Sequence, residues 1–170
     1  MGQKVNPHVI RLGITQNWAS RWFDEKHYKE MVLADYTLRK QLMEKLKMAG
    51  VARVDIERSI NSLRVILYVS RPGIVIGRGG TGLEDVKKLI VATYAAKVQS
   101  KHLPKLDIRV EPVKEPNLES QLVAVNISDQ LIKRLPFKRV LNTTAERVMS
   151  SGALGVKVVL TMPTFMGMVT

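Results

Sequence analysis

Ile74-Val-Ile-Gly77-Arg78-Gly79-Gly80-Thr81-Gly82-Leu83-Glu84 is the stretch on which the interpretation of this chain depends. It places an arginine among glycines, between a short apolar run and the start of a predicted helix. Glycine permits positive φ and close backbone approach, so a ligand's backbone can lie against Gly77 to Gly80 without meeting a Cβ atom. Arg78 then offers its charge to a phosphate. Thr81 and Glu84 have the spacing of a capping box, which predicts that a helix begins directly after the loop.

Three interpretations of these glycines are open. Gly77, Gly79 and Gly82 match the dinucleotide-binding pattern Gly-x-Gly-x-x-Gly, which alone is weak evidence. A dinucleotide-binding turn follows a long buried strand, whereas the three residues 74–76 before Gly77 are more typical of a helical turn. The residues favour the second interpretation, the Gly-x-x-Gly loop of a KH domain, which clamps about four nucleotides of single-stranded RNA. The third interpretation is a purely structural glycine turn.

The segments around the loop predict a regular α+β domain over residues 35–112. Apolar residues at helical spacing predict a helix that begins near Asp35 or Thr37, as its cap, and stops at Gly50. Alternation over 52–57 and 63–69 predicts a hairpin of two half-buried strands. A short helix at 74–77, a longer helix from 82 to about 98, and a strand over 106–110 follow. The residues predicted to face inward on the longer helix are Leu83, Val86, Leu89, Ile90 and Thr93. This order matches the second topological type of KH domain.

Residues 1–34 show no clean helical or strand period and are predicted to form an extended N-terminal arm. The arm interleaves basic residues with aromatic ones, an arrangement that can neutralise phosphates and stack on bases. Its candidate RNA contacts are Lys4, Arg11 and Arg21. The alternative is that Trp18, Trp22 and Phe23 simply pin the arm to its own domain.

Two prolines within residues 112–116 predict a hinge at 113–116, and a second α+β domain is predicted over 117–170. An apolar helix is expected to end near Leu135-Pro136, and a second helix to present Phe137, Leu141, Thr144 and Val148 on one face. Alternation over Gly155 to Thr161 predicts a strand.

Basic residues gather around the predicted junction of these two helices. They are Lys133, Arg134, Lys138, Arg139 and Arg147. A charge run of this kind is often no more than a solvated helix face. The chain as a whole carries a formal net charge of +12, which favours a polyanionic partner such as nucleic acid.

Several motifs together resemble the ribosomal protein S-three family of the small subunit. They are the opening Met1-Gly-Gln-Lys-Val-Asn-Pro7, then Arg11-Leu-Gly-Ile14, Ser20-Arg-Trp-Phe23 and Gly73-Ile-Val-Ile-Gly-Arg-Gly-Gly80. The resemblance runs from the N-terminus to about Val159 and implies a protein of the small-subunit head. It stops at residues 162–170, so we expect the second domain to be incomplete relative to the family.

The resemblance also implies particular partners and roles. They are ribosomal RNA, messenger RNA near its entrance channel, and neighbouring head proteins, on a ribosome that could be cytoplasmic or organellar. Lys138 and Arg139 fall on a basic motif that the family associates with unwinding messenger, while another basic position of that motif is Asn142 here.

Enzymatic interpretations gain little support from the residues. The three histidines stand apart without metal-ligand spacing, and the chain has no cysteine and no apolar run of membrane-spanning length. We therefore expect a non-enzymatic RNA-binding protein of the small subunit without cofactor, metal, membrane or small-molecule substrate. The alternatives are a free KH-domain regulator or assembly factor and, from a different class, a nucleotide-dependent oxidoreductase.

Overall fold

The computed structural model describes residues 2–59, 61–97 and 105–161, and these residues divide between Lys114 and Glu115 into two compact units. The first unit combines helices with a four-stranded sheet and the second contains two helices. The α+β class expected from the sequence is therefore confirmed. The division between the units falls inside the predicted hinge 113–116. Residues 162–170, where the resemblance ended, lie outside the described part of the chain.

The sheet of the first unit has the strand order β1-β2-β3-β4. Strand β2 (Val51–Ser59) and strand β3 (Ser62–Val69) form the predicted antiparallel hairpin. Strand β4 (Lys105–Pro112) then runs parallel to β3, and the two-residue strand β1 (Ser20–Arg21) runs parallel to β2. Parallel neighbours need a crossover connection, which the chain between β3 and β4 provides.

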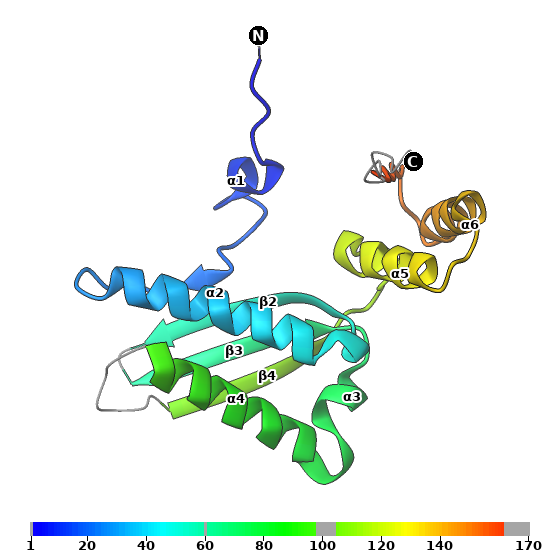
Figure 1. The fold of residues 1–170 in the computed structure, drawn as a ribbon. Coiled ribbons are helices and arrows are strands. Elements are labelled where there is room, and N and C mark those ends of the chain that lie inside the picture. The colour runs from blue at the N-terminus through cyan, green and yellow to red at the C-terminus, as the bar shows by residue number, and fades with distance from the viewer. Residues whose placement is uncertain (1, 60, 98–104, 162–170) are drawn as a thin grey trace, which may run out of the picture. The chain divides into compact units, whose positions relative to one another are not determined.

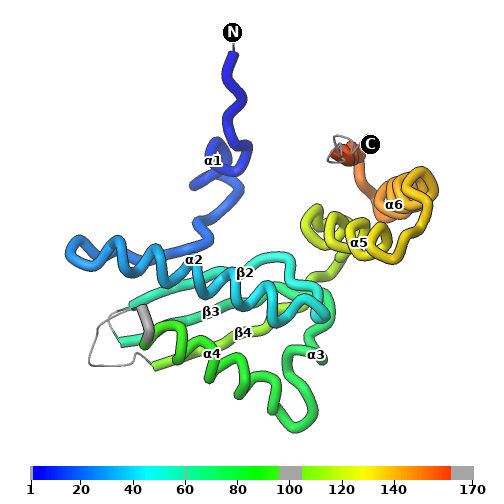
Figure 2. Tube along the Cα trace, viewed as in Figure 1, coloured from blue at the N-terminus to red at the C-terminus, as the bar shows by residue number. Residues whose placement is uncertain are grey.

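Three helices lie between the strands in sequence. They are α2 (Tyr28–Lys45), α3 (Pro72–Ile76) and α4 (Thr81–Lys97). Helices α2 and α4 lie side by side over one face of the sheet (Figure 1). The tube in Figure 2 follows the chain from β3 through α3 into α4. The fully buried side chains of this core include Leu42, Ile56, Leu67, Val75 and Ile90.

The inward face predicted for α4 is confirmed. Val86 and Ile90 are 1% exposed, Thr93 is buried, and Leu83 and Leu89 pack against the core. The predicted start of α2 is wrong because the helix begins at Tyr28, within the segment that the sequence assigned to the arm. Asp35 is buried inside the helix instead of capping it. The predicted stop at Gly50 is also wrong for α2, which ends at Lys45 with Leu46 as its C-cap. Gly50 instead ends the short 3-10 helix η1 (Lys47–Ala49) that follows, with a left-handed φ of 67°.

The N-terminal segment contains more structure than an extended arm. A short helix α1 (Pro7–Arg11) begins after Asn6, whose side chain accepts a hydrogen bond from the His8 N–H at 2.9 Å. Proline in the first turn suits this position, because its fixed φ is helical and its missing N–H has no partner there anyway. Strand β1 then joins the segment to the sheet of the first unit.

The second unit contains helix α5 (Ser120–Ile132) and helix α6 (Phe137–Ser150), both as expected. The buried face of α6 differs in part from the prediction: Val140, Thr144 and Val148 are buried, whereas Phe137 is 45% exposed. The strand predicted over 155–161 is wrong, since these residues form no regular element in the structure. A strand needs a neighbouring strand for its hydrogen bonds, and the described part of this unit holds none.

Candidate RNA interface

The glycine loop connects α3 to α4 through three residues with left-handed φ. The φ values are 70° at Gly77, 64° at Gly79 and 83° at Gly80. Helix α3 ends where the Gly77 N–H donates to the Gly73 carbonyl at 3.0 Å, and the short 3-10 helix η2 (Arg78–Gly80) follows. Residues with a Cβ atom rarely adopt this backbone. The run of glycines is therefore required by the path of the chain.

Two glycines allow the loop to fold tightly onto itself. A Cβ atom on Gly77 would lie 2.8 Å from the Gly82 nitrogen, and one on Gly82 would lie 2.4 Å from the Val75 carbonyl oxygen. By contrast, a Cβ atom on Gly79 or Gly80 would meet nothing within 4 Å. Gly77 and Gly82 thus allow α3 and α4 to approach closely, while the backbone at Gly79 and Gly80 has free space beside it.

Arg78 projects from this loop as an exposed side chain, and no ion pair between described residues involves it. The capping box predicted from Thr81 and Glu84 is wrong. The Thr81 hydroxyl donates to the Arg78 carbonyl oxygen at 3.0 Å, and Thr81 itself has helical φ and ψ. The hydroxyl therefore tightens the loop. The dinucleotide interpretation is also wrong, because a helix, and not a buried strand, precedes Gly77.

The basic residues of the second unit surround the turn between α5 and α6. Lys133 ends α5, Arg134 and Leu135 make the turn, and Lys138 and Arg139 lie in the first turn of α6. All four basic side chains are exposed, and none forms an ion pair with another described residue. Arg147 lies in the last turn of α6, so the prediction that it belongs to this junction is wrong.

Arg134 has an uncommon backbone conformation, with a φ of 61°. Its N–H donates to the Leu131 carbonyl at 2.8 Å, and the Leu135 N–H donates to the Gln130 carbonyl at 3.3 Å. These two bonds make a Schellman motif, in which the left-handed position is usually glycine. An arginine here costs stability that a glycine would not.

The three candidate residues of the N-terminal segment differ in their surroundings. Lys4 and Arg11 are exposed, and Arg11 ends helix α1. Arg21 lies in β1 and forms an ion pair with Glu57 of β2, so its charge is already engaged. The aromatic residues also divide: Trp22 is held in the first unit, whereas Trp18 and Phe23 are 63% and 84% exposed.

A buried carboxylate that sequence reasoning missed holds this segment in place. Asp35 accepts hydrogen bonds from the Ser20 hydroxyl at 2.9 Å and from Trp22 Nε1 at 2.8 Å. It also pairs with Arg58, whose guanidinium lies 5.1 Å from the centre of the Tyr94 ring. The sequence did contain one signal for this site, which is an aspartate among apolar residues at helical spacing. A carboxylate buried at such a position needs a cationic partner.

Charged side chains on the sheet face opposite the helices form ion pairs with one another. Arg64 reaches Glu57 at 3.2 Å and Asp107 at 3.0 Å, and Arg109 lies 3.5 Å from Asp107. The hydrogen bond from Arg64 lowers the pKa of Asp107. On the same face Arg53 pairs with Asp55, whose pKa is raised by burial. Arg53, Arg64 and Arg109 are therefore already engaged with carboxylates of the same face.

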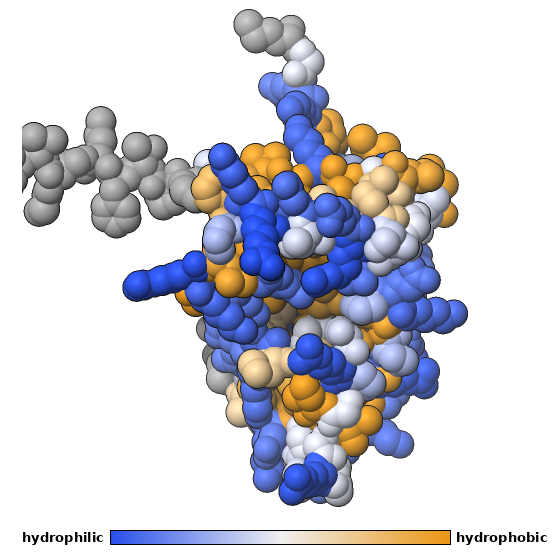
Figure 3. Space-filling model, turned by 90° about the vertical axis from the view of Figure 1, so that its right-hand side faces the viewer, coloured by the Kyte–Doolittle hydropathy of each residue, from blue (hydrophilic) through white to orange (hydrophobic). Residues whose placement is uncertain are grey.

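The described surface mixes hydrophilic side chains with apolar ones, as the face in Figure 3 shows. Within the described ranges, no helix combines the length and apolar character needed to cross a membrane.

Comparison with known proteins agrees with this geometry. The KH domain family matches residues 37–118. The chain is 42% identical to small ribosomal subunit protein uS3 of Desulfitobacterium hafniense over 158 residues, which is 93% of the chain and 68% of that protein. It is 43% identical to uS3 of Caldicellulosiruptor bescii over 158 residues, or 92% of the chain and 68% of the relative.

The chain belongs to the uS3 family of small-subunit ribosomal proteins. Its relative in Lachnoclostridium phytofermentans is 41% identical over 157 residues and is likewise matched over 68% of its length. The family resemblance expected from the sequence and the KH domain are thus both confirmed, and the chain is a ribosomal protein with an RNA-binding domain.

Proposed function

We propose that the chain is a structural protein of the small-subunit head, where its glycine loop binds ribosomal RNA. The observation that carries this proposal is the open backbone at Gly79 and Gly80 beside the unpaired cation of Arg78. A phosphodiester backbone can approach these glycines without a steric clash, and Arg78 supplies a charge-assisted hydrogen bond. Helix α4 starts directly after the loop, so its N-terminal amides add a favourable potential for phosphate.

One matched pair of variants tests the loop. Gly79→Asp and Gly79→Asn introduce side chains of nearly the same shape, and both residues tolerate left-handed φ better than most. We expect Gly79→Asp to weaken binding of the chain to ribosomal RNA by roughly tenfold at low salt, because its carboxylate repels phosphate. Gly79→Asn should lose much less. Equal affinities for the two variants and the wild type, with unchanged circular dichroism, would mean that the loop is only structural.

We further propose that Lys138 and Arg139 face messenger RNA near the entrance to the ribosome and aid its unwinding without nucleotide hydrolysis. Both cations lie in the first turn of α6, where the positive end of the helix dipole disfavours them. A polyanionic partner would offset this cost, and no carboxylate pairs with either residue within the described part of the chain.

Replacing both residues by Ala should separate stability from function. The melting temperature should stay equal or rise slightly, while ribosomes that carry the variant should stall more often on messengers with a stable hairpin at the entrance. Unstructured messengers should be translated normally. Arg147→Ala, at the other end of α6, is the control and should not cause selective stalling.

Asn142→Lys should sharpen the contrast, because it adds a charge about one helical turn after Arg139. Equal slowing on both kinds of messenger would instead place these residues on ribosomal RNA or in solvent.

A free KH-domain regulator is the second candidate, favoured by the match of the KH domain family itself. Sedimentation through a sucrose gradient at high salt separates the two candidates. A structural subunit protein stays with the small subunit in cytoplasmic or organellar ribosomes, whereas a regulator washes off.

A further inference from the structure

Helix α2 has apolar side chains on opposite faces. Leu38 and Leu42 are buried in the core, while Leu33 and Tyr36 on the far side are 48% and 67% exposed. A surface helix of a globular protein usually has one apolar stripe that faces the core, with polar residues on the opposite face. The outer face of α2 departs from this pattern, because it carries exposed apolar side chains between its charged ones.

Two lysines flank this outer apolar pair. Lys29, Leu33, Tyr36 and Lys40 follow one another at spacings of four, three and four residues, so they form a single stripe. At a rise of about 1.5 Å per residue, the two lysines lie roughly 16 Å apart along the helix. Both are exposed, and neither pairs with a carboxylate among the described residues.

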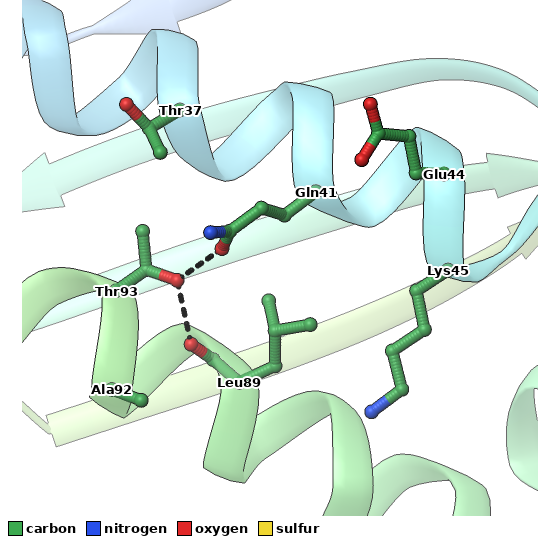
Figure 4. A pocket seen from close by; sticks show the side chains of 7 residues that line it. All are labelled: Thr37, Gln41, Glu44, Lys45, Leu89, Ala92 and Thr93. Atoms are coloured by element: carbon green, nitrogen blue, oxygen red, sulfur yellow. Dashed lines mark hydrogen bonds between the residues drawn. The ribbon is translucent and has the colours of Figure 1, made fainter.

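A groove between α2 and α4 lies beside the stripe and has a volume of about 520 Å³. Figure 4 shows Leu89 and Ala92 of α4 facing Gln41 of α2 across it. The Thr93 hydroxyl lies 2.5 Å from Gln41 Oε1, which fixes the Gln41 amide, and Lys45 Nζ donates to the Asp85 carbonyl at 3.0 Å. These hydrogen bonds fix side chains that line the groove, and the groove can receive an apolar side chain from a partner.

We infer that the outer face of α2 and the groove beside it form a docking surface for a helix of another protein. That helix would direct apolar side chains at Leu33, Tyr36 and the groove, and would place carboxylates against Lys29 and Lys40. Tyr36 offers a π face on which a base can stack, but Leu33 does not, and RNA interfaces are more polar than this apolar pair, so a protein partner covers both side chains better. Tyrosine and methionine are enriched at protein interfaces, and Met43 is also exposed on this side of α2. The inference rests on the proposed incorporation of the chain into small subunits.

A photo-reactive benzoylphenylalanine in place of Tyr36 tests the docking surface inside the particle. Subunits carrying this chain are isolated on a gradient, irradiated, and treated with ribonuclease or protease. We expect a ribonuclease-resistant adduct between the chain of 19.1 kDa and a different protein. The same probe in place of Arg78 should form an adduct that contains RNA, and it serves as the control for the photochemistry.

The outcomes separate the docking surface from the proposed function. Failure of the wild-type chain to sediment with small subunits removes the proposed function and the docking surface with it. If the chain sediments and the Arg78 probe reacts, the docking surface is overturned when the Tyr36 probe yields only RNA, only a dimer of the chain, or no adduct.

Charge reversal then tests the predicted carboxylates. Lys29→Glu combined with Lys40→Glu should lower the yield of the protein adduct at Tyr36 by at least about fivefold, because like charges across an interface repel. Lys87→Glu combined with Lys105→Glu makes the same change in net charge away from the stripe and should leave the yield unchanged. An equal loss in both pairs would contradict the predicted charge complementarity.

Discussion

The two units of the chain bury very different amounts of apolar surface. The first unit has a continuous core that joins α2, α4 and the sheet. In the described part of the second unit, the buried apolar side chains are Ile127, Val140 and Val148. Small units bury a smaller fraction of their surface and are correspondingly marginal. We therefore expect the first unit to be the more stable of the two, because the described part of the second unit has few buried apolar side chains.

This contrast can be followed with two spectroscopic signals. Both tryptophans, Trp18 and Trp22, belong to the first unit, so intrinsic fluorescence reports its unfolding alone. Far-ultraviolet circular dichroism reports the helices of both units. We therefore expect the second unit to unfold first, in a circular dichroism change that fluorescence does not show.

The largest expected effect comes from Asp35→Ala in the first unit. The substitution leaves Arg58 buried beside Tyr94 without its carboxylate, and removing one partner of a buried pair costs about 4 kcal/mol. It also removes the acceptor of Trp22 Nε1, so the emission wavelength of the folded chain should change. Chemical denaturation followed by fluorescence measures both changes. Glu25→Ala, at an exposed position, is the control, and a loss as small as the control's would contradict the assigned role of Asp35.

A smaller effect should distinguish matched leucines in the two units. Leu42 is 0% exposed in the first unit, whereas Leu141 is only partly buried in the second. Leu42→Ala should cost about 3 kcal/mol and move the fluorescence transition, because it leaves a cavity in a closed core. Leu141→Ala should lower the free energy of unfolding of the second unit by about 1 kcal/mol. It should shift only the earlier circular dichroism transition, in which that unit unfolds. Equal costs would show that the second unit has a core as well packed as the first.

The sequence predicted the first unit well where local and long-range requirements agree. The glycine loop, the hairpin and the inward face of α4 each follow from residue type and period, and each is present in the structure. Asp35 misled the prediction because an aspartate before an apolar period resembles a helix cap. Its carboxylate in fact bonds to residues distant in sequence, which no local pattern contains.

The second unit was predicted less well for a related reason. The alternation over residues 155–161 is typical of a strand, yet an isolated strand has no partners for its backbone groups. The conformation of Arg134 was also beyond prediction: Pro136 indicates that the helix ends nearby, but arginine rarely adopts the left-handed φ found here.

Arg134 provides the smallest of these predicted effects and the one that links stability to function. Arg134→Gly relieves the left-handed backbone at the Schellman position, which should stabilise the second unit by about 1 kcal/mol and raise its circular dichroism midpoint. Arg134→Lys keeps both the charge and the backbone cost, so its midpoint should match that of the wild type. If Arg134 contacts a phosphate, Gly should also reduce the slope of log affinity against log salt by about 0.7, while Lys should preserve it. A Gly variant that is more stable and binds RNA with an unchanged salt slope would leave the arginine without a role in binding. A Gly variant that is no more stable than the wild type would mean that the turn, like the rest of this unit, is set by contacts that the isolated chain does not make.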